Sequence, residues 1–132
     1  MLELLDIEQN YFQGELPVDV LKNLNFAINK PKSVGIIGPS GSGKTSLLNI
    51  VGLIEKPKFG SYFFKNSNCL DFSNTEKTEF RKKNIGYIFQ NNQLLEDFNV
   101  QENVALPLIL NGESYKNSCK KALNFLKLFG LE

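Results

Sequence analysis

The sequence predicts an α/β fold, and three observations support this prediction. Strand-like and helix-like segments alternate over the first 90 residues, as is typical of α/β domains. A glycine-rich stretch, residues 38–43, stands between an apolar run and a helical pattern. After Gln90 only helical patterns follow. The 132 residues suffice for one domain, in which we expect a core over 1–90 and the start of a helical part over 91–132.

Five segments have the composition of strands. Leu24, Phe26 and Ile28 alternate with smaller or polar residues, which is the period of a half-buried strand. The apolar run directly before the glycines predicts a strand that is covered on both faces. The five predicted strands are residues 2–7, 24–28, 33–37, 61–64 and 85–89.

Four segments have the period or the end signals of helices. Residues 45–54 place four apolar side chains on one face, those of Leu47, Leu48, Val51 and Ile54. Ser73 and Glu76 have the spacing of a capping box, which predicts a short helix through about residue 82. Pro107 is expected to kink or end the third helix, and Gly130 is a natural residue just after the fourth. The third and fourth helices are expected at 100–110 and 115–129.

Composition excludes several classes of function. The net charge is +1, from 15 Lys and Arg against 14 Asp and Glu, so no nucleic-acid partner is expected. The absence of His excludes imidazole bases, His-ligated metals and His-containing triads. Cys69 and Cys119 stand alone, which favours inert, reduced thiols. The acidic start does not fit a signal peptide and no apolar run is long enough to span a membrane, so a cytoplasmic location is expected.

The strongest motif is the phosphate-binding pattern G-x-x-x-x-G-K-[ST]. Residues 38–45, which read Gly-Pro-Ser-Gly-Ser-Gly-Lys-Thr, match it throughout. The glycines let successive backbone N–H groups turn toward a phosphate with no Cβ in the way. We expect Lys44 to reach the β- and γ-phosphates, Thr45 to ligate Mg²⁺ and Ser46 to contact the α-phosphate. The predicted nucleotide-binding residues of the loop are Gly38, Pro39, Ser40, Gly41, Ser42, Gly43, Lys44, Thr45 and Ser46.

Other classes of phosphate-loop protein fit less well. A GTPase would carry N-K-x-D to recognise guanine, whereas Asn29 and Lys30 are followed by Pro31 and Lys32. A small-molecule kinase usually holds phosphates with several arginines, and this chain has one, Arg81. An ordinary Gly/Ser turn is the remaining alternative, and chance produces such a match in about half a percent of chains of this length.

The order of these landmarks resembles the ATP-binding subunit of an ABC transporter. An early aromatic, Tyr11, precedes the phosphate loop, and a strand-like segment ends in Gln90. Within the family the sequence looks most like the lipoprotein-releasing (LolD-type) ATPases, with macrolide-exporter and cell-division (FtsE-type) ATPases as close relatives. The resemblance implies an ABC-type ATPase core with an N-terminal antiparallel β subdomain. The segments that carry it are 11–15, 20–24, 38–45, 85–95, 95–98 and 100–108.

The resemblance also implies roles for residues outside the loop. Tyr11 would stack on the adenine ring of ATP, with a core or rim aromatic as the plainer alternative. Gln90 would be the catalytic residue that reaches Mg²⁺ and the attacking water, with a polar residue at the end of a strand as its alternative. Residues 91–103 would lie near integral membrane transporter subunits. A second ATPase protomer and a peripheral position on the cytoplasmic face of the inner membrane are also implied.

Three parts of the family pattern do not occur in the sequence. They are the LSGGQ signature, the Walker B strand that ends in Asp-Glu, and the switch His. The resemblance therefore implies an N-terminal fragment, truncated before these parts, that binds nucleotide weakly, does not turn it over, and is marginally stable or prone to aggregate. Two functions remain: the ATP-binding subunit of a transporter that powers lipoprotein release, or a non-catalytic nucleotide-binding or interaction module.

Overall fold

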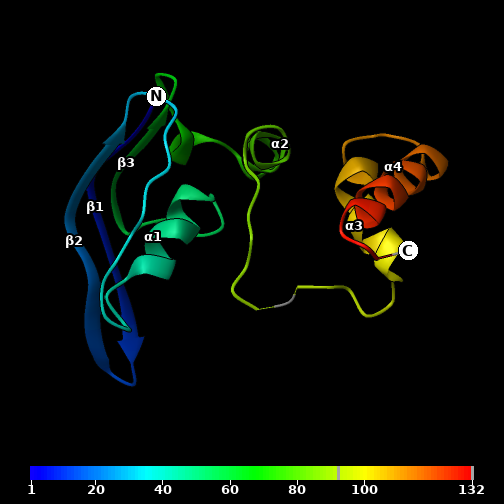
Figure 1. Ribbon diagram of the computed structural model, residues 1–132. Helices are drawn as coiled ribbons and strands as arrows, with labels where there is room; N and C mark the ends of the chain where they lie inside the picture. Colours follow the sequence, from blue (N-terminus) through cyan, green and yellow to red (C-terminus); the bar gives the residue numbers. More distant parts are fainter. Residues whose placement is uncertain (92, 132) are drawn as a thin grey trace. The chain divides into compact units, whose positions relative to one another are not determined.

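The computed structural model describes residues 1–91 and 93–131 in two compact units, Met1–Arg81 and Lys82–Glu132. The first unit holds a β-sheet with helices, and the second holds helices (Figure 1). This architecture confirms the predicted α/β fold with an antiparallel β subdomain. Among the described residues, no helix is long and apolar enough to cross a membrane.

The first unit is built on a four-stranded antiparallel sheet in the order β2-β1-β3-β4. Strands β1 (Leu2–Gln13) and β2 (Leu16–Ile28) form a long hairpin, with Gly14 in the left-handed conformation at its turn (φ 65°). Strands β3 (Phe59–Phe64) and β4 (Ser67–Asn68) extend the sheet on the other side of β1. The strands predicted at 2–7, 24–28 and 61–64 are therefore confirmed.

Gly60 lies inside β3, although the sequence placed it before the strand. The register between β1 and β3 shifts between Leu5 and Glu8, as is typical of a β-bulge. A Cβ on Gly60 would stand 2.6 Å from the carbonyl oxygens of both Leu5 and Asp6, and its φ is 103°. Only glycine tolerates this approach, so the residue serves the bulge and does not break the strand.

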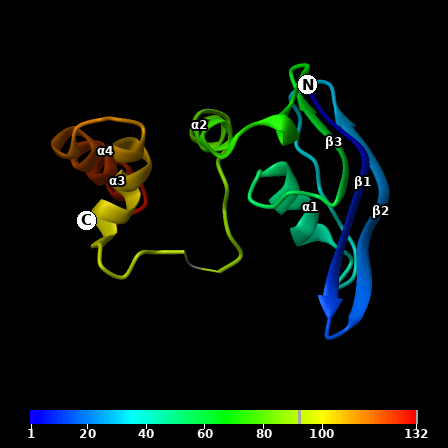
Figure 2. The ribbon, with the colours of Figure 1, turned by 180° about the vertical axis from the view of Figure 1, so that it is seen from behind.

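Helix α1 (Lys44–Val51) covers one face of this sheet (Figure 2). The helix ends earlier than the sequence predicts, because Gly52 caps it and Leu53 turns into the left-handed region (φ 52°). The Tyr62 hydroxyl donates to the Val51 carbonyl over 3.1 Å and so ties the end of α1 to β3. The core between helix and sheet consists of Leu4, Ile7, Leu21, Leu47, Ile50, Leu53, Tyr62 and Cys69.

Two predicted strands are wrong: residues 33–37 and 85–89 have no regular secondary structure. Ile37 is 95% exposed and Ile88 is 97% exposed, although both belong to apolar runs. A strand exists only when a neighbouring strand completes its hydrogen bonds. Within the described part of the chain neither run is paired with a neighbouring strand, so composition alone does not make them strands.

The segment after the sheet confirms the predicted capping box. A 3₁₀ turn, η1 (Cys69–Asp71), leads to α2 (Asn74–Asn84). The Ser73 N–H donates to the Glu76 carboxylate over 2.8 Å, and the Glu76 N–H donates to the Ser73 hydroxyl over 3.3 Å. These two bonds satisfy backbone donors that the first turn of the helix leaves free.

The second unit contains a pair of packed helices, α3 (Val100–Leu110) and α4 (Tyr115–Leu128). Pro107 lies inside α3, and the helix continues to Leu110, so the proline does not end it. Gly130 has φ 68°, which confirms the predicted left-handed residue after the last helix. The buried residues of the pair are Ala105, Ser118, Ala122 and Leu126.

Candidate functional site

The glycine-rich loop joins residues 33–37 to α1 and is open to solvent. Residues 38–42 are all exposed. Gly41 (φ 80°) and Gly43 (φ 84°) adopt the left-handed conformation that other residues rarely accept. The Ser42 N–H donates to the Pro39 carbonyl over 3.3 Å, which closes a tight turn within the loop. Glycine at positions 41 and 43 therefore has a conformational reason in this structure.

The end of the loop packs against the β-hairpin. A Cβ on Gly43 would stand 2.9 Å from the Leu21 side chain and 2.9 Å from both the side chain and the carbonyl oxygen of Val20. Gly43 itself is buried. The close packing on β2 sets the position at which α1 begins, and hence the direction in which its first amides point.

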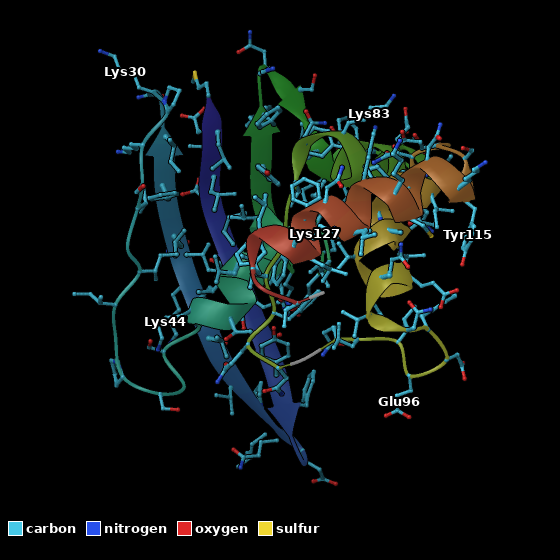
Figure 3. The ribbon with its side chains drawn as sticks, turned by 45° about the vertical axis from the view of Figure 1, so that its right-hand side comes forward. Lys30, Lys44, Lys83, Glu96, Tyr115 and Lys127 are labelled. Atoms are coloured by element: carbon cyan, nitrogen blue, oxygen red, sulfur yellow. The ribbon has the colours of Figure 1, made fainter. Side chains whose placement is uncertain are left out.

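The side chain of Lys44 folds back over the loop that precedes it. Its ammonium donates to the carbonyl of Gly38 over 2.9 Å, to the carbonyl of Pro39 over 2.6 Å, and to the Ser42 hydroxyl over 3.3 Å. Figure 3 labels Lys44 at the start of α1. These contacts use all three ammonium donors, so the positive charge is held at the loop.

The first turn of α1 has the features of an anion-binding helix terminus. No side chain caps it, since Gly43 is the N-cap residue, and the turn contains no acidic residue. The first N–H groups of a helix have no partner within the helix, and the helix dipole places partial positive charge there. The loop, the ammonium of Lys44 and these amides together form a site suited to phosphate groups.

Thr45 and Ser46 follow in the same turn. Thr45 is exposed and Ser46 is partly buried. A hydroxyl oxygen is a hard ligand of the kind that Mg²⁺ accepts, so Thr45 fits the predicted role. Within the part of the chain that the structure describes, no group of three His, Cys, Asp or Glu residues is placed to hold a metal ion.

The structure brings Tyr11 to the start of α1. Its hydroxyl lies 3.0 Å from the hydroxyl of Ser46 and 2.8 Å from a carboxylate oxygen of Glu55. The pKa of the Tyr11 phenol is raised above its ordinary value, chiefly because the group is partly buried. The hydrogen bond with Ser46 lowers this pKa, and the bond to Glu55 raises it. The sequence analysis missed Glu55, and no local pattern marks it, because it lies 44 residues from Tyr11.

Gln90 belongs to the second unit, where its side chain is exposed in an irregular segment. Its predicted contacts with Mg²⁺ and the attacking water stay predictions.

The sequence analysis also missed the part that Asn103 plays in the segment 91–103. Its amide N–H groups donate to the carbonyls of Leu95, Phe98 and Asn99 over 2.9–3.1 Å, and its side-chain oxygen accepts the Leu95 N–H over 2.8 Å. One side chain on α3 thus organises the loop before that helix.

Comparisons with known proteins agree with the motif and the fold. Residues 21–132 match the family described as ABC transporter. The chain is 36% identical over 132 residues to the lipoprotein-releasing system ATP-binding protein LolD of Hyphomonas neptunium, and 36% identical over 132 residues to the LolD of Buchnera aphidicola subsp. Acyrthosiphon pisum. Each match covers 100% of this chain and 58% of the relative.

A solved structure gives the same result. The ATP-binding cassette MJ0796, in a dimeric post-hydrolysis state bound to ADP and Pi, matches with a TM-score of 0.90 and 38% sequence identity. The match covers 100% of this chain and 58% of that chain. The present chain therefore spans 58% of the length of these proteins.

Proposed function

We propose, for a chain that belongs to the ABC transporter family, that residues 38–46 bind the phosphates of Mg·ATP. One observation carries the proposal: the exposed loop, with Gly41 and Gly43 in the left-handed conformation, leads into a helix whose first amides no side chain caps. Such a terminus accepts phosphate. The bound ADP and Pi named for MJ0796 support the same type of ligand.

The residues of the loop would contact different parts of the triphosphate, according to the groups that each residue offers. The backbone N–H groups of Gly38, Ser40, Gly41, Ser42 and Gly43 surround phosphate oxygens, whereas Pro39 has no N–H and contributes the carbonyl that holds Lys44. The Lys44 ammonium offsets the charge of the β- and γ-phosphates, and the Ser46 hydroxyl or amide serves the α-phosphate.

Gln90 and Tyr11, which lie outside the loop, complete the proposal together with Thr45. Thr45 and Gln90 would hold Mg²⁺, which when bound offsets phosphate charge. Gln90 would also orient the attacking water in the whole protein. Tyr11 would stack on the adenine ring, and its hydroxyl contact with Ser46 supports a place beside the loop.

The wider role that we propose is that of the ATP-binding subunit in a transporter that releases lipoproteins from the inner membrane. The names of the relatives at 36% identity support it. In this role the segment 91–103 would contact integral membrane subunits at the cytoplasmic face of the membrane, and two ATPase protomers would pair, as the dimer of MJ0796 supports.

Calorimetric titration of the chain with Mg·ATP tests the central proposal. We expect saturable binding in the wild type and a loss of roughly tenfold or more in Lys44→Ala, because a charge-assisted hydrogen bond to phosphate is removed. Lys22→Ala is the matched control, since Lys22 lies outside the loop and forms an exposed ion pair with Asp19 at 3.2 Å. Equal affinities of the wild type and Lys44→Ala, or no binding by folded wild type, would refute the proposal.

A further inference from the structure

The carboxylate of Glu55 holds two side chains of β1. One of its oxygens accepts the hydroxyl of Tyr11 over 2.8 Å, and the other accepts the side-chain amide of Gln9 over 2.5 Å. Gln9 is only 7% exposed, and its own carbonyl oxygen accepts the Lys58 N–H over 3.1 Å. Each oxygen of the Glu55 carboxylate thus has a defined partner. Both the nitrogen and the oxygen of the Gln9 side-chain amide are hydrogen-bonded.

The direction of the bonds at Tyr11 follows from the available protons. A phenol has one proton, and an ionised carboxylate can only accept. The Tyr11 hydroxyl therefore donates to Glu55 and accepts the hydroxyl proton of Ser46. Both bonds of the tyrosine side chain thus end at its hydroxyl oxygen.

This arrangement connects Glu55 to the phosphate loop without placing it in the loop. Ser46 lies in the first turn of α1, directly after the proposed Mg²⁺ ligand Thr45. Tyr11 remains 39% exposed while its hydroxyl is bonded. The ring is therefore ordered at its polar end and still available to a ligand.

We propose that Glu55 is a positioning residue, which fixes the ring of Tyr11 beside the loop so that it stacks on the base of the bound nucleotide. The proposal rests on the proposed function, because it requires Mg·ATP to bind at residues 38–46. An aromatic ring that is ordered beforehand loses less conformational freedom when the base arrives. The effect of Glu55 should accordingly be confined to the base and leave the phosphates untouched.

The test compares two probes that share the phosphate chain: Mg·ATP, which has a base, and Mg·tripolyphosphate, which has none. Calorimetry measures both affinities for the wild type, Glu55→Ala and Tyr11→Phe. We expect each variant to bind Mg·ATP about three- to tenfold more weakly, the range that corresponds to an aromatic contact. Both should bind Mg·tripolyphosphate within about twofold of the wild type.

Two further variants distinguish the positioning of Tyr11 by Glu55 from the loss of a negative charge and from a general loss of structure. The double variant of Tyr11→Phe and Glu55→Ala should bind Mg·ATP as the single variants do, because the bond between Tyr11 and Glu55 is the one that both substitutions remove. Glu15→Ala removes a carboxylate from the exposed hairpin turn and should leave the ratio of the two affinities unchanged. Should Glu55→Ala fail to fold, Glu55→Gln takes its place beside Tyr11→Phe, because Tyr11→Phe keeps the ring but removes the bonds to both Glu55 and Ser46.

The outcomes distinguish the two proposals. If the folded wild type binds neither probe, the proposed function fails and takes this inference with it. If the wild type binds both probes but the ratio of affinities is unchanged in Glu55→Ala and Tyr11→Phe, only the role of Glu55 is refuted. Equal weakening of both probes, or additive losses in the double variant, would also overturn it.

Discussion

The carbonyl oxygen of Val20 lies 2.9 Å from the point that a Cβ on Gly43 would occupy. This contact joins the β-hairpin to the end of the phosphate loop, two segments with different sequence signals. It explains why the second glycine of the motif is required by packing as well as by its φ of 84°.

Gly43→Ala should lower the free energy of unfolding by more than about 2 kcal/mol, since it adds a left-handed strain and a clash with backbone. Gly14→Ala is the matched control. Gly14 also has a positive φ, 65°, but nothing lies within 4 Å of its added Cβ. The control should cost about 1 kcal/mol from φ alone. Urea unfolding followed by circular dichroism measures both free energies. Equal losses in the two variants would show that the contact with Val20 does not contribute to the cost of Gly43→Ala.

The hydroxyl of Ser118 gives a prediction of the opposite sign. It is completely buried in α4 and has no hydrogen-bond partner among the described residues. Leaving a buried hydroxyl unsatisfied is unfavourable, so Ser118→Ala should raise the free energy of unfolding by about 1 kcal/mol. Ser114→Ala is the control. Its hydroxyl caps α4 by accepting the Asn117 N–H, so its removal should lower the same quantity by about 1 kcal/mol. A loss of stability in Ser118→Ala would contradict the structure.

Tyr115 and Glu102 form a bond between α4 and α3 that a pH titration can detect. The Tyr115 hydroxyl donates to the Glu102 carboxylate over 2.6 Å, and this bond, the largest cause, raises the pKa of Tyr115 to about 12. The raised pKa means that the bond stabilises the fold below the ordinary tyrosine pKa, and that this stabilisation is lost as the pH rises through about 12.

Glu102→Gln should return the pKa of Tyr115 toward its ordinary value of 10.0. Carbon NMR of ring-labelled tyrosine, with the signal assigned by Tyr115→Phe, measures the shift. The same bond, followed by the backbone bond from Asn99, lowers the pKa of Glu102. Tyr115→Phe should therefore raise the pKa of Glu102. If neither pKa responds to the loss of its partner, the bond does not form in solution.

The buried hydroxyl of Tyr62 should contribute to the free energy of unfolding, and this contribution should depend on pH. It is 1% exposed, and its bond to Val51 satisfies a carbonyl at the end of α1. Tyr62→Phe keeps the ring and should lower the free energy of unfolding by about 1 kcal/mol at neutral pH. An unchanged value would show that water satisfies both groups equally well.

Burial raises the pKa of Tyr62 beyond the usual range for tyrosine. The unfolded chain therefore loses this proton first as the pH rises above about 10, and the wild type should be destabilised there. Tyr62→Phe should show a smaller loss of stability between neutral and alkaline pH than the wild type, as measured by urea unfolding at both values. Equal losses of stability in the two proteins would mean that Tyr62 ionises as easily in the folded protein as in the unfolded chain.

Much of the site and of the helical structure could be predicted because the relevant partners are close in sequence. The capping box of Ser73 and Glu76 spans three residues, and the bonds form as expected. The helix pattern predicted over 115–129, which forms as α4 (Tyr115–Leu128), and the glycine after it are also local signals. The phosphate loop belongs to this class too, since Lys44 bonds to carbonyls five and six residues earlier.

The two wrong strand predictions show a feature that the local sequence does not predict, namely the pairing of a strand with a neighbour. Residues 33–37 and 85–89 have apolar composition, but a strand also needs a neighbour to complete its backbone hydrogen bonds, and composition carries no information on that neighbour. The end of α1 was likewise misplaced, because Gly52 and Leu53 stop the helix while the apolar spacing continues to Ile54.

The amino-acid sequence by itself determined the phosphate-loop motif and the capped helices, because each depends on residues a few positions apart, and the order of motifs along the chain indicated its family. Only the tertiary structure decided which distant groups meet: Gly43 against Val20, and Glu55 with Gln9 and Tyr11. The physical reason is that the antiparallel sheet and the helix on its face bring together residues that lie more than 20 positions apart, and their complementarity becomes effective only once the chain has folded.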